Sequence, residues 1–171
     1  MSITNIPILG FAAASGTGKT TLLTQILPLL NHAGLRVGLI KHSHHNFEID
    51  HEGKDSFRLR KSGATPMVLV SKYRRAIIED FAIPNEPTLA DQITFFDSSN
   101  IDLILVEGFR HESFPKIELH RASLNELFLY PNDAQIIAIA TDTFLETDLP
   151  QLNLNQPAEI AAFVLHKFLK L

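Results

Sequence analysis

The stretch that decides the fold is Pro7–Leu22, PILGFAAASGTGKTTL, in which a short apolar run leads into a glycine-rich loop. The apolar residues at Ile8–Ala12 predict a short buried strand. Residues Ala13–Thr20 then match the phosphate-loop pattern G-x-x-x-x-G-K-[ST], except that Ala13 stands where the pattern has its first glycine. From Lys19 onward the apolar spacing becomes that of a helix. Because the motif requires this strand–loop–helix context, the stretch predicts a site for nucleotide phosphates.

The residue types of the loop suit the binding of a polyphosphate. Gly16 and Gly18 lack a Cβ atom, so the backbone can turn tightly and approach a ligand closely. The N–H groups of residues 15–20 are expected to converge at the start of the next helix, where the helix dipole favours an anion. We expect Lys19 to contact the terminal phosphates and the hydroxyl of Thr20 to bind Mg²⁺. The alternative is a glycine-rich turn before an ordinary helix. The predicted nucleotide-binding residues of the loop are Ser15, Gly16, Thr17, Gly18, Lys19, Thr20 and Thr21.

The composition is that of an ordinary globular protein. With 171 residues, of which 45% are hydrophobic and 20% charged, the chain is expected to form a single nucleotide-binding domain over residues 1–171. A net charge of −4 provides no basic surface for nucleic acid. The absence of cysteine excludes disulfides, thiolate catalysis and cysteine-ligated zinc, and it fits a reducing cytoplasm. No apolar run reaches the roughly 18 residues of a membrane span, so we expect a cytoplasmic protein that binds neither nucleic acid nor membranes.

The rest of the chain predicts an α/β fold with a mostly parallel sheet, flanking helices and one antiparallel hairpin. The loop helix is expected to be kinked by Pro28 and to end near Gly34, and a strand at Leu35–Ile40 then completes a right-handed βαβ unit. The other strands are expected at Met67–Val70, paired in a hairpin with Tyr73–Glu79, and at Asp102–Phe109, Pro115–His120 and Gln135–Ala140, the last buried one. The other helices are expected at Lys54–Ser62, from a cap at Thr88 to about Phe96, and from Pro157 onward.

A second decisive stretch, Asp102–Phe109 (DLILVEGF), places a carboxylate at the end of an apolar run. Four consecutive apolar residues indicate a strand buried on both faces. An unpaired Glu107 at the mouth of an apolar core would cost on the order of several kcal/mol, so a cation must compensate it. An apolar strand followed by an acidic residue has the form of a Walker B element. Glu107 is therefore a candidate magnesium ligand and, with Lys19, a candidate catalytic residue. The alternative is a structural ion pair with Lys19 or Lys41.

Three further carboxylates are candidates for metal or base contacts. Asp55 begins a helix that leaves the expected ligand side of the sheet, so it ranks above Asp50 as a metal ligand; its alternative role is to interact with the helix dipole. Asp142 follows the last predicted buried strand, near the expected place of a base. A carboxylate can accept both N1–H and N2–H₂ of guanine, whereas adenine presents an acceptor at N1. Asp142 thus predicts a preference for GTP, unless it only closes a turn.

Histidines are densest in the polar segment that follows the second strand. His42 and His44 would share a face of an extended backbone, where they could bind Zn²⁺ or Ni²⁺. Alternatively they line a pocket for an anionic substrate together with Lys41, or belong to a solvated loop. Arg58 lies on the basic face of the next predicted helix, and such a face is usually solvated. The candidate contacts to a substrate or anion are Lys41, His42, His44 and Arg58.

In order and spacing, the segments FAAASGTGKTTLL, GLIKHSHH, GKDSFRLRKSGA, DLILVEGF, PKIEL and AIATD resemble one family, the molybdopterin-guanine dinucleotide biosynthesis adapter proteins (MobB). The resemblance implies a P-loop NTPase fold of the SIMIBI type, GTP binding with Mg²⁺, weak GTP hydrolysis and a homodimer. It implies a metal shell of Thr20, Asp55 and Glu107. It further implies a partner, the guanylyltransferase that joins GMP to molybdopterin, with molybdopterin itself as a further candidate ligand.

The favoured hypothesis is therefore a GTP-binding adapter with weak GTPase activity, since the sequence offers no obvious water-orienting residue or arginine finger. Three alternatives remain open. A P-loop small-molecule kinase would place a cosubstrate beside the histidine segment. A nickel or zinc metallochaperone GTPase would use His42, His44 and His45, although cysteine and a long histidine tract are absent. A dimeric module could also sense the nucleotide without turnover.

Overall fold

The computed structural model describes residues 6–43 and 46–171, and these form two compact units. The described residues up to His42, together with Thr88–Leu171, make up the first, the sheet unit; Ser43–Pro87 make up the second, the hairpin unit. The expectation of one domain over residues 1–171 stays a prediction. None of the helices in the described part of the chain has the length and apolar character needed to cross a membrane.

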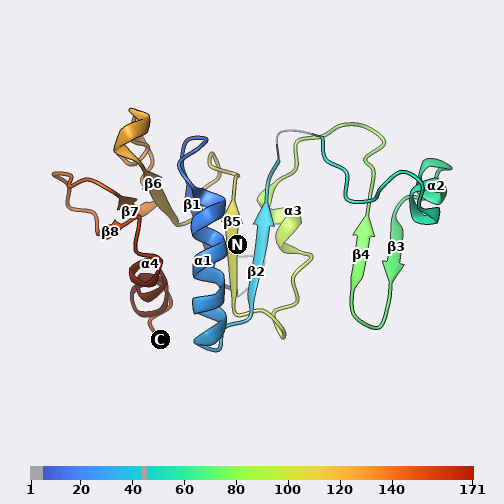
Figure 1. Ribbon diagram of the computed structural model, residues 1–171, viewed down its shortest axis with the longest axis horizontal. Coiled ribbons are helices and arrows are strands. Elements are labelled where there is room, and N and C mark those ends of the chain that lie inside the picture. The colour runs from blue at the N-terminus through green and yellow to red at the C-terminus, as the bar shows by residue number, and fades with distance from the viewer. Residues whose placement is uncertain (1–5, 44–45) are drawn as a thin grey trace. The chain divides into compact units, whose positions relative to one another are not determined.

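The sheet unit is built on a parallel sheet with the strand order β2-β5-β1-β6-β7-β8 (Figure 1). Each pair of neighbouring strands runs parallel, and β1, which precedes the glycine-rich loop, lies between β5 and β6. The carboxyl ends of these strands therefore meet at one edge, where open α/β sheets bind their ligands. The strands are β1 (Ile8–Ala12), β2 (Val37–Lys41), β5 (Leu103–Glu107), β6 (Lys116–His120), β7 (Ile136–Thr141) and β8 (Gln151–Asn153).

The first crossover of the sheet contains a helix, because a connection between parallel strands has to pass over a face of the sheet. Helix α1 joins β1 to β2, and α4 follows β8 and contacts α1. The helices of the sheet unit are α1 (Lys19–His32), α3 (Leu89–Ile93), α4 (Pro157–Phe163), which continues as a π-helical turn at Val164–Phe168, and the 3₁₀ turns at Ala122–Leu124 and Tyr130–Asn132.

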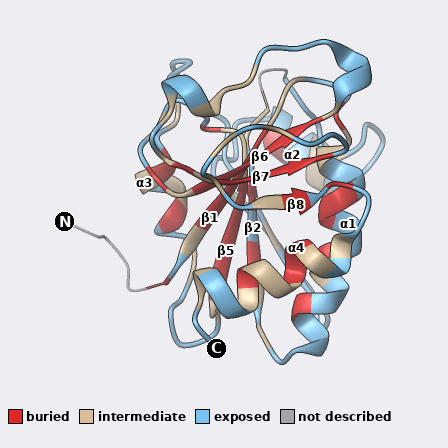
Figure 2. Cartoon of the chain, turned by 90° about the vertical axis from the view of Figure 1, so that its left-hand side faces the viewer, coloured by how far each residue is buried: buried red, intermediate tan, exposed pale blue. Residues whose placement is uncertain are grey.

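Both faces of the sheet are buried, as the uninterrupted apolar run of β5 predicts. Leu103 and Leu105 belong to the core cluster that includes residues of α1 and α4, whereas Ile104 and Val106 belong to the cluster that includes residues of α3. All four side chains have no exposed surface. Figure 2 shows the strands of the sheet unit as a buried layer, with α3 on one side of it and α1 and α4 on the other. The expected α/β architecture, a mostly parallel sheet with flanking helices and an antiparallel hairpin, is confirmed.

Local capping follows the sequence closely at two helix ends. The Thr88 side chain accepts a hydrogen bond from the Asp91 N–H and so caps α3, although α3 ends at Ile93 rather than at the expected Phe96. Helix α1 continues through Pro28 to His32 and is followed by Gly34 with φ = 91°. A left-handed glycine is a common way to end a helix, so the expected end of α1 is confirmed.

Strand β8 was not expected from the sequence. It has three residues, Gln151–Asn153, and only its central Leu152 is buried. The Gln151 side chain holds the preceding loop in place: its Oε1 accepts from the Leu145 N–H at 2.9 Å and its Nε2 donates to the Leu145 carbonyl at 2.7 Å. A strand of three residues is too short to show a periodic pattern. Because β8 follows β7 and pairs with it, Gln135–Ala140 is not the final strand of the sheet.

The hairpin unit contains α2 (Asp55–Lys61) and the antiparallel strands β3 (Met67–Val70) and β4 (Arg75–Ile78), in which Met67 pairs with Ile78. The expected hairpin is confirmed. Arg60 of α2 is nearly buried, and its guanidinium reaches Glu48 at 2.7 Å and Asp80 at 2.9 Å. These two contacts connect α2 with the segments on either side of it.

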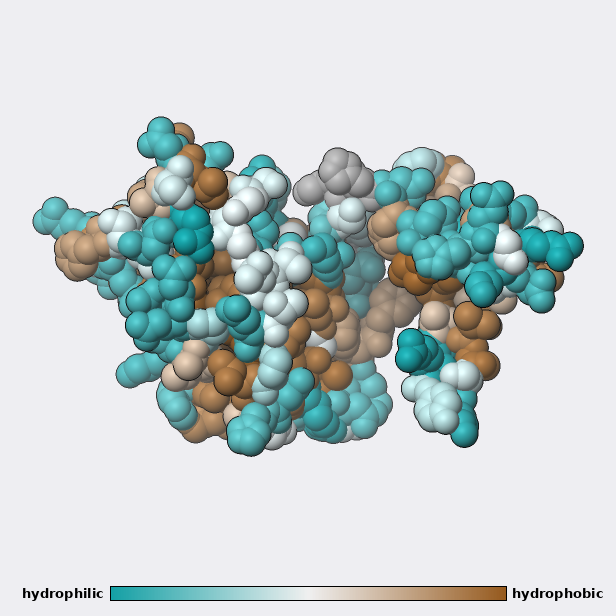
Figure 3. Space-filling model, in the orientation of Figure 1, coloured by the Kyte–Doolittle hydropathy of each residue, from teal (hydrophilic) through white to brown (hydrophobic). Residues whose placement is uncertain are grey.

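The hairpin unit exposes many apolar side chains. Val68, Leu69 and Val70 of β3 and Ile77 of β4 are each about half exposed or more. Figure 3 shows hydrophobic side chains over the hairpin, next to the hydrophilic surface of the same unit. A two-stranded sheet is at best marginally stable in water, so these side chains are exposed on a unit that has little apolar interior of its own.

Candidate functional site

The glycine-rich loop between β1 and α1 has the backbone that the motif predicts. Gly16 (φ = 79°) and Gly18 (φ = 100°) both adopt the left-handed region, where side-chain-bearing residues are disfavoured. The main-chain N–H groups of residues 15–20 donate no hydrogen bond to any described residue. The Thr17 hydroxyl donates to the Ala14 carbonyl at 2.9 Å and so braces the loop. The loop thus presents a set of unpaired donors at the start of α1, as an anion site requires.

Lys19 lies over the start of this loop. Its ammonium donates to the carbonyls of Ala13 and Ala14, at 3.0 Å each. Burial lowers the pKa of Lys19; the positive charges of Lys41 and Arg110 also lower this pKa, whereas the negative charge of Glu107 raises it. Three cations and one carboxylate therefore act on each other here, with a net charge of +2. Such a group is suited to a polyphosphate anion.

Glu107 ends β5, the strand between β1 and β2, and its side chain is only 13% exposed. Its Oε2 accepts a hydrogen bond from the Lys41 Nζ at 3.2 Å. The ion pair that the sequence offered as an alternative is therefore present. The pair shows that a cation neutralises this carboxylate, as its burial requires. The roles of Glu107 as a magnesium ligand and catalytic residue stay predictions.

A tight turn follows Glu107 and fixes the next residues against the end of β2. Gly108 (φ = 109°) and Phe109 (φ = 50°) are both left-handed, and a Cβ on Gly108 would lie 2.5 Å from the Cβ of His42. The His42 ring stacks on Phe109 with centroids 4.4 Å apart, and the main-chain N–H of His42 donates to the Glu107 carbonyl at 2.8 Å. His42, expected as an anion or metal contact, thus has a packing role, and its ligand role stays a prediction. Arg110 comes directly after this turn.

Arg110 is the residue of the site that the sequence did not indicate. It lines the same cavity as Ala14 and Thr17 of the loop. Its guanidinium Nε donates to the ring of His111 at 3.1 Å. No motif pointed to it, because its place beside the loop depends on the two left-handed residues before it. Of these, only Gly108 has a residue type that suggests a left-handed conformation.

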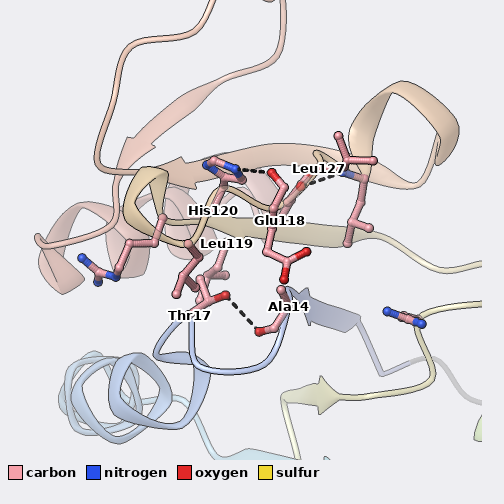
Figure 4. A pocket seen from close by; sticks show the side chains of 11 residues that line it. Ala14, Thr17, Glu118, Leu119, His120 and Leu127 are labelled. Atoms are coloured by element: carbon pink, nitrogen blue, oxygen red, sulfur yellow. Dashed lines mark hydrogen bonds between the residues drawn. The ribbon is translucent and has the colours of Figure 1, made fainter.

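The cavity beside the loop has a volume of about 90 Å³ and is also lined by the carboxyl end of β6 (Figure 4). Glu118 is buried there and accepts hydrogen bonds from the N–H groups of Leu129 and Tyr130, at 2.7 and 2.8 Å. Burial raises the pKa of Glu118, whereas these two hydrogen bonds lower it. At about 30 Å³ for one water molecule, the cavity has room for a small polar group next to the loop.

Asp142 follows β7 at the same edge of the sheet, and its carboxylate is already bonded. Its Oδ1 accepts from the Ala122 N–H at 2.9 Å, and its Oδ2 lies 3.3 Å from a guanidinium nitrogen of Arg121. These contacts tie the end of β7 to the segment after β6. The carboxylate therefore has a structural role in the described chain, and its predicted contact to guanine stays a prediction.

The remaining candidates lie outside the sheet unit. Asp55 and Arg58 belong to α2 of the hairpin unit, where they are 3.7 Å apart and their side chains are 93% and 77% exposed. Their predicted roles in metal and anion binding stay predictions. His44 and His45 lie outside the described residues. Within residues 6–43 and 46–171, no three side chains of histidine, cysteine, aspartate or glutamate form a group that could hold a metal ion.

Comparisons with known proteins agree with this architecture. A family model described as molybdopterin guanine dinucleotide synthesis protein B matches residues 8–142. The chain is 44% identical to a molybdopterin-guanine dinucleotide biosynthesis adapter protein from Escherichia coli (strain K12), over 94% of this chain and 93% of the relative. It is 42% identical to the protein of that name from Haemophilus influenzae, over 95% of this chain and 92% of the relative.

Solved structures extend the likeness to the fold. A crystal structure of Bacillus subtilis MobB matches with a TM-score of 0.73, covering 93% of this chain and 96% of that one at 24% identity. A crystal structure of molybdopterin-guanine biosynthesis protein B matches with a TM-score of 0.70, covering 92% of this chain and 97% of that one, also at 24% identity. At this identity the structural likeness shows a shared P-loop-type fold.

Proposed function

Because the chain belongs to the molybdopterin guanine dinucleotide synthesis protein B (MobB) family, we propose that it is a GTP-binding adapter of molybdopterin-guanine dinucleotide biosynthesis. In this role it binds GTP with Mg²⁺, hydrolyses it slowly and assists the guanylyltransferase that joins GMP to molybdopterin. The adapter role is supported by the names of the relatives, which cover nearly the whole chain. The nucleotide is supported by the geometry of the loop.

The observation that carries the nucleotide proposal is that main-chain N–H groups without acceptors among the described residues and the ammonium of Lys19 occur in the same loop. The N–H groups of residues 15–20 donate to nothing in the described chain, and the Lys19 ammonium is held at the same loop by two carbonyls. A triphosphate would accept from these N–H groups, and Lys19 would exchange its carbonyl partners for phosphate oxygens. The ammonium would then face ionised phosphate oxygens in place of neutral carbonyls, and the attraction between opposite charges favours this exchange.

Thr20 and Glu107 would hold the magnesium ion beside the terminal phosphates. Mg²⁺ on a phosphate loop takes few protein ligands and completes its octahedron with phosphate oxygens and water. When bound, it would neutralise charge between the two terminal phosphates. The residues proposed here bind the phosphates or the metal, and none of them is proposed as a base for the attacking water. Slow hydrolysis is therefore expected.

The nucleotide proposal is tested by titrating the protein with GTP and with ATP in the presence of Mg²⁺, using isothermal calorimetry. We expect wild-type protein to bind GTP more tightly than ATP, and Lys19→Ala to weaken GTP binding about 100-fold or more, since several charge-assisted hydrogen bonds are lost. Lys167→Ala, which removes an exposed lysine of the terminal helical turn, is the control. Unchanged GTP affinity in Lys19→Ala would rule out the phosphate loop as the site.

The adapter role needs the guanylyltransferase itself. Adding the chain to purified guanylyltransferase, GTP and molybdopterin should raise the rate of dinucleotide formation, and Lys19→Ala should lose this effect while Lys167→Ala keeps it. A rate that does not change over a wide range of added protein would contradict the adapter role.

We also propose that the chain acts as a homodimer. The exposed apolar side chains of β3 and β4 support a second copy as their cover. Analytical ultracentrifugation should then give about twice the chain mass of 19.1 kDa. A mass of one chain at micromolar concentration would contradict this.

A further inference from the structure

The ion pair between Lys41 and Glu107 occupies the edge of the sheet where the phosphate loop begins. Lys41 is the last residue of β2 and Glu107 the last residue of β5, and the two are direct partners in the parallel register. Glu107 is also in register with Phe11 of β1, two residues before the start of the loop motif. The pair is therefore placed by strand pairing, and the carboxylate lies next to the strand that carries the loop.

The two partners differ in how far they depend on each other. The Glu107 side chain is 13% exposed, so its carboxylate has lost most of its water and needs a cation beside it. The Lys41 side chain is 54% exposed, and an ammonium on a long flexible stem can return to water or move to another anion at little cost. Glu107 thus requires a cation, but this cation need not be Lys41.

The surroundings determine which cation is favoured in each state. Without a ligand, Glu107 is neutralised by Lys41, while Lys19 is held by two carbonyls and Arg110 adds positive charge. A free divalent ion would have to displace Lys41 and approach three positive charges. A triphosphate reverses this balance, because its oxygens attract the same three cations and supply further ligands for the metal.

We propose that Lys41 is an exchangeable partner of Glu107. Its ion pair prevents free divalent metal from binding to the Glu107 carboxylate until a nucleoside triphosphate binds. In the nucleotide-free protein, Lys41 holds the carboxylate. When the triphosphate enters the loop, the Lys41 ammonium moves to a phosphate oxygen, and Glu107 becomes available to the metal that accompanies the nucleotide. This inference rests on the proposed nucleotide site and adds the order of loading: metal binds to Glu107 only with the triphosphate. Lys41 is a positioning residue in this scheme.

The first half of the exchange is tested with Mn²⁺ alone and nucleotide-free protein, with free Mn²⁺ measured by electron paramagnetic resonance. Lys41→Met should bind Mn²⁺ about tenfold more tightly than wild type, whereas Lys41→Arg, which keeps the cation, should not. Lys167→Met makes the same change in net charge at an exposed site and should leave the affinity unchanged. In Lys41→Met/Glu107→Gln the gain should disappear. Thermal unfolding identifies the variants that are folded.

The second half is tested with GTP in the presence of EDTA, where no metal can bridge the phosphates. Lys41→Met should bind GTP about tenfold more weakly than wild type, and Lys41→Arg should restore most of the loss. Mn²⁺ affinities of Lys41→Met and wild type within twofold of each other, or a gain that persists without Glu107, would overturn the inference. Equal GTP affinities in EDTA would overturn it as well. Wild-type protein that binds no GTP under any condition would instead overturn the proposed function.

Discussion

Arg110 is held beside the phosphate loop by the two residues before it. Gly108 and Phe109 both adopt positive φ, and for Phe109 this costs roughly 1–2 kcal/mol. The stack of Phe109 on His42 offsets part of this cost, because it buries one ring against the other. Residues held in strained backbone conformations cluster at functional sites. We therefore expect Arg110 to contact the triphosphate.

Arg110→Ala should weaken GTP binding about tenfold, which is the loss expected for one charge-assisted hydrogen bond. Arg110→Lys should recover only part of the loss, because an ammonium lacks the planar fork of the guanidinium. Calorimetric titration with GTP measures both variants, and Arg74→Ala in the hairpin unit is the exposed control. An Arg110→Ala variant with wild-type affinity would remove Arg110 from the site.

Asp142→Asn should change the base preference and leave the fold intact. The asparagine oxygen can still accept from the Ala122 N–H, so this link between the end of β7 and the segment after β6 is kept, whereas the ion pair with Arg121 is lost. The new NH₂ group cannot accept from guanine, but it can donate to the additional carbonyl of xanthine. GTP affinity should fall at least about tenfold while xanthosine triphosphate gains. Competition binding with the two nucleotides measures this, and an unaltered preference would contradict a role in base recognition.

Whole elements were predictable where burial sets the pattern. The run Leu103–Val106 is apolar at every position because both faces of β5 are covered, and the loop motif specifies the end of β1 and the start of α1. Strand β8 was not predictable, since three residues are too few to show a periodic pattern. The short α3 was predicted by its Thr88 cap but not by its end, where no glycine or proline marks the last turn.

In the turn between β5 and β6, Gly108→Ala tests how much the close packing of Gly108 against His42 contributes to stability. Alanine would have to adopt φ = 109° with its Cβ 2.5 Å from the Cβ of His42, so we expect a loss of about 2–4 kcal/mol in the free energy of unfolding. Urea denaturation measures it. Gly34→Ala is the matched control, because Gly34 has φ = 91° but nothing within 4 Å of its ideal Cβ. Equal losses of unfolding free energy in both variants would show that the close approach to His42 does not add to the cost of a Cβ at Gly108.

For the molecule as a whole, the phosphate loop and the carboxylate after β5 could be found from sequence because each lies within one contiguous motif. The Lys41–Glu107 pair could only be offered as one of two alternatives, since it depends on the register of β2 against β5. The place of Arg110 depends on a turn with one non-glycine residue at positive φ. The register of one strand against another and a positive φ at a residue other than glycine were thus the parts that could not be predicted.

The stability of the molecule toward acid should depend on Asp102. Its hydrogen bonds with Arg36 lower the pKa of Asp102 from 3.8 to about 2. Because the pKa is lower in the folded state, the pair stabilises the fold above about pH 4, and this stabilisation is lost as the pH falls toward 2. Asp102→Asn should therefore unfold at lower urea concentration than wild type at pH 7, and the gap should narrow in acid. A gap that stays constant with pH would contradict the role of this pair.

The most direct measurement is a crystal structure with a non-hydrolysable GTP analogue and Mn²⁺, whose anomalous signal marks the metal. The account predicts that the triphosphate accepts hydrogen bonds from the N–H groups of residues 15–20 and that Lys19 contacts its terminal phosphates. It also predicts Mn²⁺ next to Thr20 and Glu107, with Lys41 moved from the carboxylate to a phosphate oxygen. A triphosphate bound elsewhere, or Glu107 still paired with Lys41 beside a bound nucleotide and metal, would contradict it.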